Sequence, residues 1–158
     1  MKTLKQLFLP TVALLLLSCS KDSTGPGPTF DNVAGTYTGP ITASTQGILM
    51  QSVASLTITQ NAGNLAGSYG ITGTLTDGVT TVPLQGTGTL TGTIDSGHNP
   101  SVSLTVKNGI CPSVTTTFSG AHDSANQNIT LSGSIPIFDV SNCQVVLTFS
   151  NIVLILSH

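Results

Sequence analysis

Three residue types are missing from this chain, which contains no arginine, no glutamate and no tryptophan. Charged residues make up only 6% of the sequence. From Cys19 onward, two lysines stand against six aspartates, which gives a formal net charge of −4. Binding to a nucleic acid backbone requires clustered Lys and Arg. This composition therefore excludes a nucleic-acid-binding function.

The common motifs of catalysis are also missing. There is no Gly-rich phosphate loop with a Lys and no Gly-x-Ser-x-Gly nucleophile turn. Without glutamate, a catalytic carboxylate pair would need two aspartates, and those of the domain lie in or beside predicted turns, where capping or solvation explains them. We therefore expect no enzymatic activity and no cofactor.

The first eighteen residues have the pattern of an export signal. Lys2 and Lys5 form a positively charged start, an apolar run extends from Leu7 to Leu17, and the small residue Ser18 precedes Cys19. The apolar run is about a third to a half too short to span a bilayer as a helix. We therefore predict a signal peptide over residues 1–18 that is removed by processing.

The end of this signal, Leu16-Leu17-Ser18-Cys19, resembles the lipobox of bacterial lipoproteins. The resemblance implies cleavage before Cys19 and acylation of that cysteine, for example with palmitate, which would anchor the chain to a membrane. Several acyl chains on one residue make such an attachment stable. Ser20, where an Asp would favour retention in the inner membrane, implies the outer membrane of the cell envelope, on its periplasmic or surface face.

The segment that follows is a candidate linker. Residues 19–29 contain no large apolar side chain and include two Gly-Pro pairs. Such a composition is typical of a flexible tether. The remaining residues, 30–158, are numerous enough to form one domain with a real core.

The domain has the composition and periodicity of an all-β protein. It is rich in Thr, Ser and Gly, and apolar residues alternate with hydroxyl residues along most of its length. Turn signals of Asn, Asp and Gly separate the alternating runs. The pattern predicts eight or nine antiparallel strands in a meander, at 34–43, 50–60, 65–75, 79–85, 87–95, 101–108, 113–120, 127–137 and 143–156.

A short motif of apolar, small, Gly, small and apolar residues recurs at 65–69, 90–94 and 131–135. Glycine inside a strand marks a sharp bend or a gap that a large side chain covers. Small barrels have both features, and a twisted sandwich can show them too. We therefore predict a closed up-and-down barrel, with a β-sandwich as the alternative.

Two segments resemble the opening of the calycin barrels, the lipocalins and avidins. They are 34–39, Ala-Gly-Thr-Tyr-Thr-Gly, and 64–69, Asn-Leu-Ala-Gly-Ser-Tyr. Those families place Gly-x-Trp on the first strand, and this chain has Tyr37 at the position of the Trp. The resemblance implies a lipocalin-like barrel. It does not imply biotin binding, because avidin-type sites use several Trp.

Cys111 and Cys143 form an even pair in a domain predicted to be exported. Such a pair predicts a disulfide bond. In a meander, the turns that carry these two cysteines lie at the same end. A bridge would stabilise the fold by ~3–4 kcal/mol on the chain-entropy model.

The histidines are the other candidates for chemistry. His98 lies in the turn after the fifth predicted strand, and His122 and Asp123 lie in the turn after the seventh, at the end opposite the cysteines. Imidazole and carboxylate groups can bind a transition metal. However, the number and spacing of these ligands match no known site, and Asp and His are frequent turn residues. We therefore expect solvated turns and no metal site, with His98, His122 and Asp123 as weak candidates.

The same strand count predicts an orientation for the domain. With 79–85 and 87–95 as separate strands, Asp77 falls at the histidine end and the tether leaves from the cysteine end. The histidine turns would then face away from the membrane.

The last strand is apolar on both faces between Ile152 and Leu156. An exposed edge of this kind invites pairing with another chain, which would give a homo-oligomer. Closure against the strand around Tyr37 is the alternative.

Two functions fit these observations. The first is a structural or protein-interaction role in the envelope, in which the apolar side chains form a plain core. The alternative is lipocalin-like binding of a small apolar ligand in a cavity above roughly 300 Å³. The side chains expected to line that cavity are Tyr37, Tyr69, Leu90, Leu104, Phe118 and Leu131.

Overall fold

The computed structural model describes residues 27–106, 111–139 and 141–158. The predicted signal peptide, Cys19 and the tether as far as residue 26 lie outside the described residues. Within the described ranges, no helix is long and apolar enough to cross a membrane.

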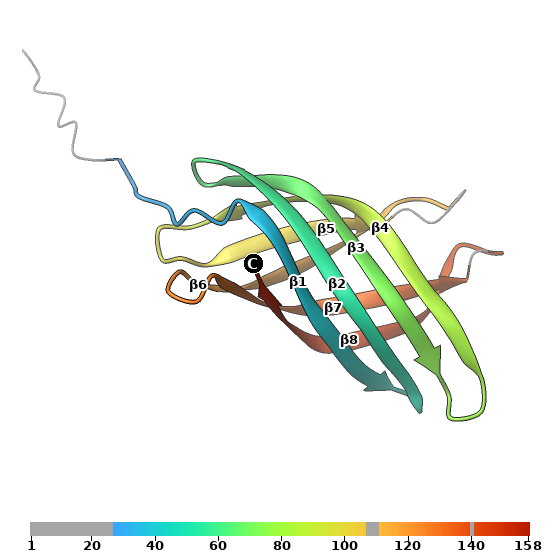
Figure 1. The fold of residues 1–158 in the computed structure, drawn as a ribbon. Coiled ribbons are helices and arrows are strands. Elements are labelled where there is room, and N and C mark those ends of the chain that lie inside the picture. Colours follow the sequence, from blue (N-terminus) through green and yellow to red (C-terminus); the bar gives the residue numbers. More distant parts are fainter. Residues whose placement is uncertain (1–26, 107–110, 140) are drawn as a thin grey trace, which may run out of the picture.

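Eight antiparallel strands follow one another around a closed barrel (Figure 1). They are β1 (Gly35–Thr45), β2 (Ile48–Asn61), β3 (Asn64–Thr76), β4 (Thr81–Ile94), β5 (Pro100–Val106), β6 (Val114–Asp123), β7 (Asn128–Asp139) and β8 (Gln144–Ser157). The predicted all-β meander barrel is therefore confirmed with eight strands. The β-sandwich alternative is wrong.

β4 is a single strand where the sequence suggested two, at 79–85 and 87–95. β3 pairs with it without interruption from Asn64↔Thr93 to Thr76↔Thr81, and Gly86 lies opposite Ile71. Because β3 holds the backbone extended on both sides of Gly86, this glycine continues the strand and forms no turn.

An even number of strands brings the two chain ends of the barrel to the same end of the cylinder. We call this the clasp end. It carries residues 30–34, the β2–β3, β4–β5 and β6–β7 turns, and the C-terminus (Figure 1). The opposite end, which we call the mouth, carries the β1–β2 and β3–β4 turns together with Cys111 and Cys143.

Two expectations about orientation are therefore wrong. Residues 30–34 lead into the barrel at the histidine end, not at the cysteine end, and Asp77 lies at the mouth with the cysteines. Both errors have one cause, since counting β4 as two strands adds one reversal of chain direction before the later turns. The histidines and the cysteines do lie at opposite ends, as expected.

Alternate side chains of the strands fill the barrel interior. The largest, Tyr37, Phe118 and Phe149, are at most 1% exposed. Phe118 covers Gly133, where an added Cβ would lie 2.5 Å from a carbon of its ring. The expectation that a large side chain packs over a strand glycine is thus confirmed at Gly133.

β8 closes the barrel between β7 and β1. It pairs with β7 from Asn128↔Ser157 to Asp139↔Gln144 and with β1 at Thr38↔Ser157. On its outer face Val153 is 54% and Ile155 58% exposed. These two side chains are available on the outer face for contact with a partner chain.

Candidate functional site

The barrel wall opens on one side of the mouth. β5 pairs with β4 from Gly88 to Ile94, whereas Thr81–Thr87 of β4 pair with β3 alone among the described residues. Across the opening, β7 pairs with β6 only as far as Ser132 in the described part of the chain, and its later residues pair with β8. The β3–β4 hairpin and the β7–β8 pair consequently diverge at the mouth (Figure 1).

A cleft of about 470 Å³ occupies this opening. Most of its lining is aliphatic or aromatic, and it lies between β3, β4, the end of β5 and β7. The lining residues are Tyr69, Ile71, Leu75, Val82, Pro83, Leu84, Gln85, Gly86, Thr87, Val106, Ile135, Pro136, Ile137 and Phe138. A neighbouring cleft of about 330 Å³ shares Leu75, Val82 and Ile137 with it and reaches Gln46 and Val146. Together they form one apolar surface, which we call the mouth cleft.

Polar groups of the mouth cleft are few and uncharged, with one exception. Tyr69 is 6% exposed, and its hydroxyl has no hydrogen-bond partner among the described residues. Burial raises the pKa of this hydroxyl, so it stays neutral. The exception is Asp77 of the β3–β4 turn, whose Oδ1 accepts hydrogen bonds from the backbone N–H groups of Val79 (2.9 Å) and Thr80 (2.7 Å). Those two bonds hold the pKa of Asp77 below its usual value, with Thr80 contributing most.

The six side chains expected to line an internal cavity all lie in the core. Five of them, Tyr37, Leu90, Leu104, Phe118 and Leu131, are at most 4% exposed and do not line the mouth cleft. The space between Tyr69, Leu104, Phe118 and their neighbours is only about 10 Å³. Tyr69 alone of the six borders the mouth cleft. The middle of the barrel is therefore packed, and the room for a ligand lies at the mouth.

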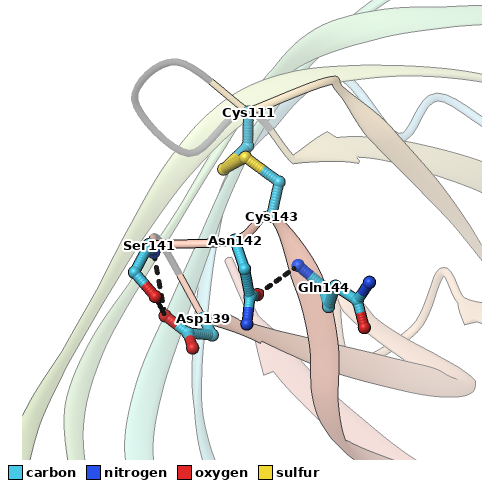
Figure 2. Close-up of a disulfide and its surroundings, with 6 residues drawn as sticks. All are labelled: Cys111, Asp139, Ser141, Asn142, Cys143 and Gln144. Carbon is cyan, nitrogen blue, oxygen red and sulfur yellow. Dashed lines mark hydrogen bonds between the residues drawn. A yellow bond between two sulfur atoms is a disulfide. The ribbon is translucent and has the colours of Figure 1, made fainter.

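Cys111 and Cys143 form the predicted disulfide at the rim of the mouth, with Cα atoms 5.2 Å apart (Figure 2). The turn beside it is held by Asp139, whose Oδ1 accepts hydrogen bonds from the backbone N–H and the hydroxyl of Ser141 at 2.8 and 2.7 Å. Asn142 Oδ1 accepts a further bond from the N–H of Gln144. The bridge ties the chain before β6 to the β7–β8 turn.

The clasp end is closed by residues 30–34, which we call the plug. Val33 is fully buried, and its N–H donates to Gln60 Oε1 at 2.7 Å. The side-chain amide of Gln60 donates in turn to the carbonyl of Asp31. Phe30 packs on Gly63, where an added Cβ would meet its ring at 2.9 Å.

Asp31 contacts both of the candidate histidines, His98 and His122. Its Oδ1 lies 2.8 Å from His98 Nδ1 and its Oδ2 lies 2.8 Å from His122 Nδ1. The hydrogen bond from His122 is the largest cause of a lowered pKa at Asp31, with the charge of His98 adding to it. His122 is not in a solvated turn, since it lies within β6 with its side chain only 1% exposed.

Asp123 belongs to a different local structure. Its carboxylate accepts hydrogen bonds from Ala125 N, Asn126 N and Asn126 Nδ2, and so closes the β6–β7 turn. In the described ranges, no group of three or more His, Cys, Asp or Glu is arranged to hold a metal ion. Asp31 was missed as the partner of the histidines because its position depends on an even number of strands, which the sequence left open.

Comparison with protein-family models, curated proteins and solved structures finds no match for this chain. The two ends of the barrel differ in a way that bears on function. The clasp end is closed by hydrogen bonds, whereas the mouth presents an open apolar cleft.

Proposed function

We propose that this protein is a lipid-anchored lipoprotein of the cell envelope whose barrel binds a small apolar molecule in the mouth cleft, without catalysis. The observation that carries the proposal is the apolar cleft of about 470 Å³ above a packed interior. Its volume falls within the range of roughly 300–1,000 Å³ that is usual for small-molecule sites.

The rim of the mouth supports the same proposal. Four exposed valines lie at this end of the barrel, namely Val79 (94%), Val82 (47%), Val145 (49%) and Val146 (57%), and Val82 and Val146 line the mouth cleft. Contiguous exposed apolar surface commonly marks a binding site on a soluble domain. Each methylene of a ligand that leaves water in the cleft would contribute up to about 0.8 kcal/mol to binding.

The mouth would face away from the membrane if Cys19 is acylated, because the plug enters at the clasp end. The eight Cα–Cα steps from Cys19 to Gly27 span at most about 29 Å. A strand of 14 residues such as β4 is about 46 Å long. With Cys19 held at the membrane beside the clasp end, the rim of the mouth would open to the surrounding compartment, from which the ligand would come.

A cavity-filling variant tests binding directly. Gly86 lines the cleft, and a Cβ added there meets no atom within 4 Å. In residues 20–158, which retain every strand and the whole core, Gly86→Leu should lower the affinity for the neutral fluorescent probe N-phenyl-1-naphthylamine at least about tenfold, because the new side chain occupies the site. Thr89→Leu adds the same side chain at an exposed position of β4 outside the cleft and should bind normally. Equal affinities in both variants, or no probe binding by the parent, would reject the proposed site.

Anchoring has its own test. Globomycin, which blocks the signal peptidase of lipoproteins, should leave a larger precursor, and Cys19→Ala should abolish incorporation of labelled palmitate. An unchanged precursor together with no palmitate label on the parent chain would rule out acylation.

The outer face of the barrel favours a second candidate function, an interaction with another envelope protein. Val53 and Ile155 are 54% and 58% exposed on either side of Pro40, which pairs with Val53 across β1 and β2. Replacing Val53 and Ile155 by Thr should release a protein that is crosslinked to the native chain in its own envelope. An unchanged crosslinking pattern would count against this role.

A further inference from the structure

The charges around the mouth cleft bear on the class of ligand, provided that the proposed binding function holds. None of the side chains that line the cleft of about 470 Å³ carries a charge. The described residues contain neither Lys nor Arg. His98 and His122 are held at the clasp end, at the far end of the barrel.

Within the part of the chain that the structure describes, the ionisable groups near the mouth are acidic. Asp77 lines the neighbouring cleft, and its Oδ1 accepts two backbone hydrogen bonds. Asp139, one residue beyond the lining residue Phe138, accepts two from Ser141. A carboxylate or phosphate on a ligand would meet no cation among the described residues, and it would lose hydration beside two negative charges.

The shape of the cleft adds a second constraint. Tyr69 and Leu75 both line it and are six residues apart on β3, which corresponds to about 20 Å along a strand. A volume of about 470 Å³ spread over that length leaves a cross-section of roughly 25 Å². This width suits one extended hydrocarbon chain better than a fused-ring system.

We infer that the mouth cleft selects a neutral, chain-like apolar molecule, such as a long-chain alcohol, ester or isoprenoid, and discriminates against the corresponding carboxylate. The chain lies along β3 and β4, with its end toward Tyr69. The uncharged head stays near the rim, where the acidic turns of Asp77 and Asp139 lie.

Competition experiments on residues 20–158 test this selectivity. The measurement is the displacement of bound N-phenyl-1-naphthylamine at pH 8 by four competitors, each below its micelle concentration. They are dodecan-1-ol, methyl dodecanoate, dodecanoate and the rigid neutral steroid progesterone. The alcohol and the ester should compete at least about tenfold more tightly than dodecanoate and progesterone. Dodecanoate or progesterone that competes as tightly as the alcohol would overturn the inference and leave apolar binding intact. Failure of the probe and of every competitor to bind would instead reject the proposed function.

A lysine introduced into the cleft tests the charge argument separately from the measurements on the parent protein. Gln85 lines the cleft and is exposed, so Gln85→Lys should raise the affinity for dodecanoate about tenfold and leave that for dodecan-1-ol unchanged. Thr89→Lys, outside the cleft on the same strand, should change neither. If Gln85→Lys does not improve dodecanoate binding, the charge argument is wrong.

Lys107 follows the lining residue Val106 and lies outside the described residues. The competition is therefore repeated with Lys107→Gln, which should leave the preference for neutral chains unchanged. Carboxylate binding by the parent that disappears in Lys107→Gln would overturn the inference.

Discussion

Asp31 and His122 are 91 residues apart in the sequence, yet Asp31 Oδ2 lies 2.8 Å from His122 Nδ1. The same carboxylate reaches His98 through its other oxygen. One side chain at the entrance of the domain thus connects the plug to the β4–β5 turn and to the end of β6. Through these two contacts, Asp31 attaches the plug to the barrel.

Removing this carboxylate should loosen the plug without opening the barrel. In Asp31→Ala, the backbone amides of Val33 and Ala34 should exchange with deuterium at least about tenfold faster, because local opening becomes easier. The amides of β2 and β3 should keep their protection. Asp123→Ala removes a carboxylate that closes only its own turn, so it should leave plug exchange unchanged. Unaltered exchange in Asp31→Ala would show that Gln60 and the apolar contacts hold the plug alone.

Acid should weaken the same connection. The pKa of Asp31 is lowered in the folded protein, chiefly by the hydrogen bond from His122, so the carboxylate stabilises the fold at any pH above its unfolded value near 3.8. This contribution is lost as the pH falls through the lowered folded pKa. The urea midpoint of the parent should therefore exceed that of Asp31→Asn at about pH 5, and the difference should shrink as the pH falls below about 4. A difference that persists down to pH 2 would contradict this assignment.

Two glycines should respond oppositely to the same substitution. Gly133→Ala should lower the free energy of unfolding by about 1–3 kcal/mol, because the new methyl group would press on the ring of Phe118. Gly86→Ala should change it by no more than about 0.5 kcal/mol, since the space beside Gly86 is open. Urea denaturation measures both values, and equal losses would show that the ring of Phe118 moves aside.

The disulfide should contribute more to stability than any single hydrogen bond. Its cysteines are 32 residues apart, and loop closure of that size corresponds to ~3–4 kcal/mol. Denaturation of Cys111→Ser/Cys143→Ser should show a loss of this order, and dithiothreitol should have no further effect on the double variant. A loss below about 1 kcal/mol would mean that the strand pairing alone holds the rim.

The buried hydroxyl of Tyr69 predicts an unusual result for a core substitution. Because this group has no partner among the described residues, Tyr69→Phe removes a desolvated polar atom and should leave stability unchanged or raise it by about 1 kcal/mol. Thermal unfolding measures the effect. A clear loss of stability would show that the hydroxyl is hydrogen-bonded in solution.

Much of the fold could be predicted because alternation along a strand is a local property. The period of two located the strands other than β4 and the buried face of strands such as β5, with Val102 and Leu104, but not that of β8, which is apolar on both faces. The strand count was less certain, because Gly86 has the local signature of a turn and continues as a strand only through its pairing with β3. Counting β4 as two strands also led to the wrong prediction of the end at which residues 30–34 enter the barrel.

The candidate site was harder to foresee for a physical reason. A cleft at the mouth arises where β4 extends beyond β5 and where β7 leaves β6, and these offsets between strands are set by tertiary pairing. The sequence therefore identified the core residue Tyr69 as a liner but not Pro83 or Phe138. Asp31 has an equally non-local role, because its partners lie in the β4–β5 turn and at the end of β6.

The proximity of the two ends of the barrel chain has a consequence for engineering. The ring of His158 lies 5.2 Å from that of Tyr37, and the backbone N–H of His158 donates to the carbonyl of Gln127. A short linker from His158 to Phe30 should therefore produce a circular permutant with new ends in the exposed β3–β4 turn. The β3–β4 hairpin would then be two separate strand ends beside the mouth cleft. If such a permutant folds but no longer binds the probe, the covalent connection between β3 and β4 is required to hold a ligand.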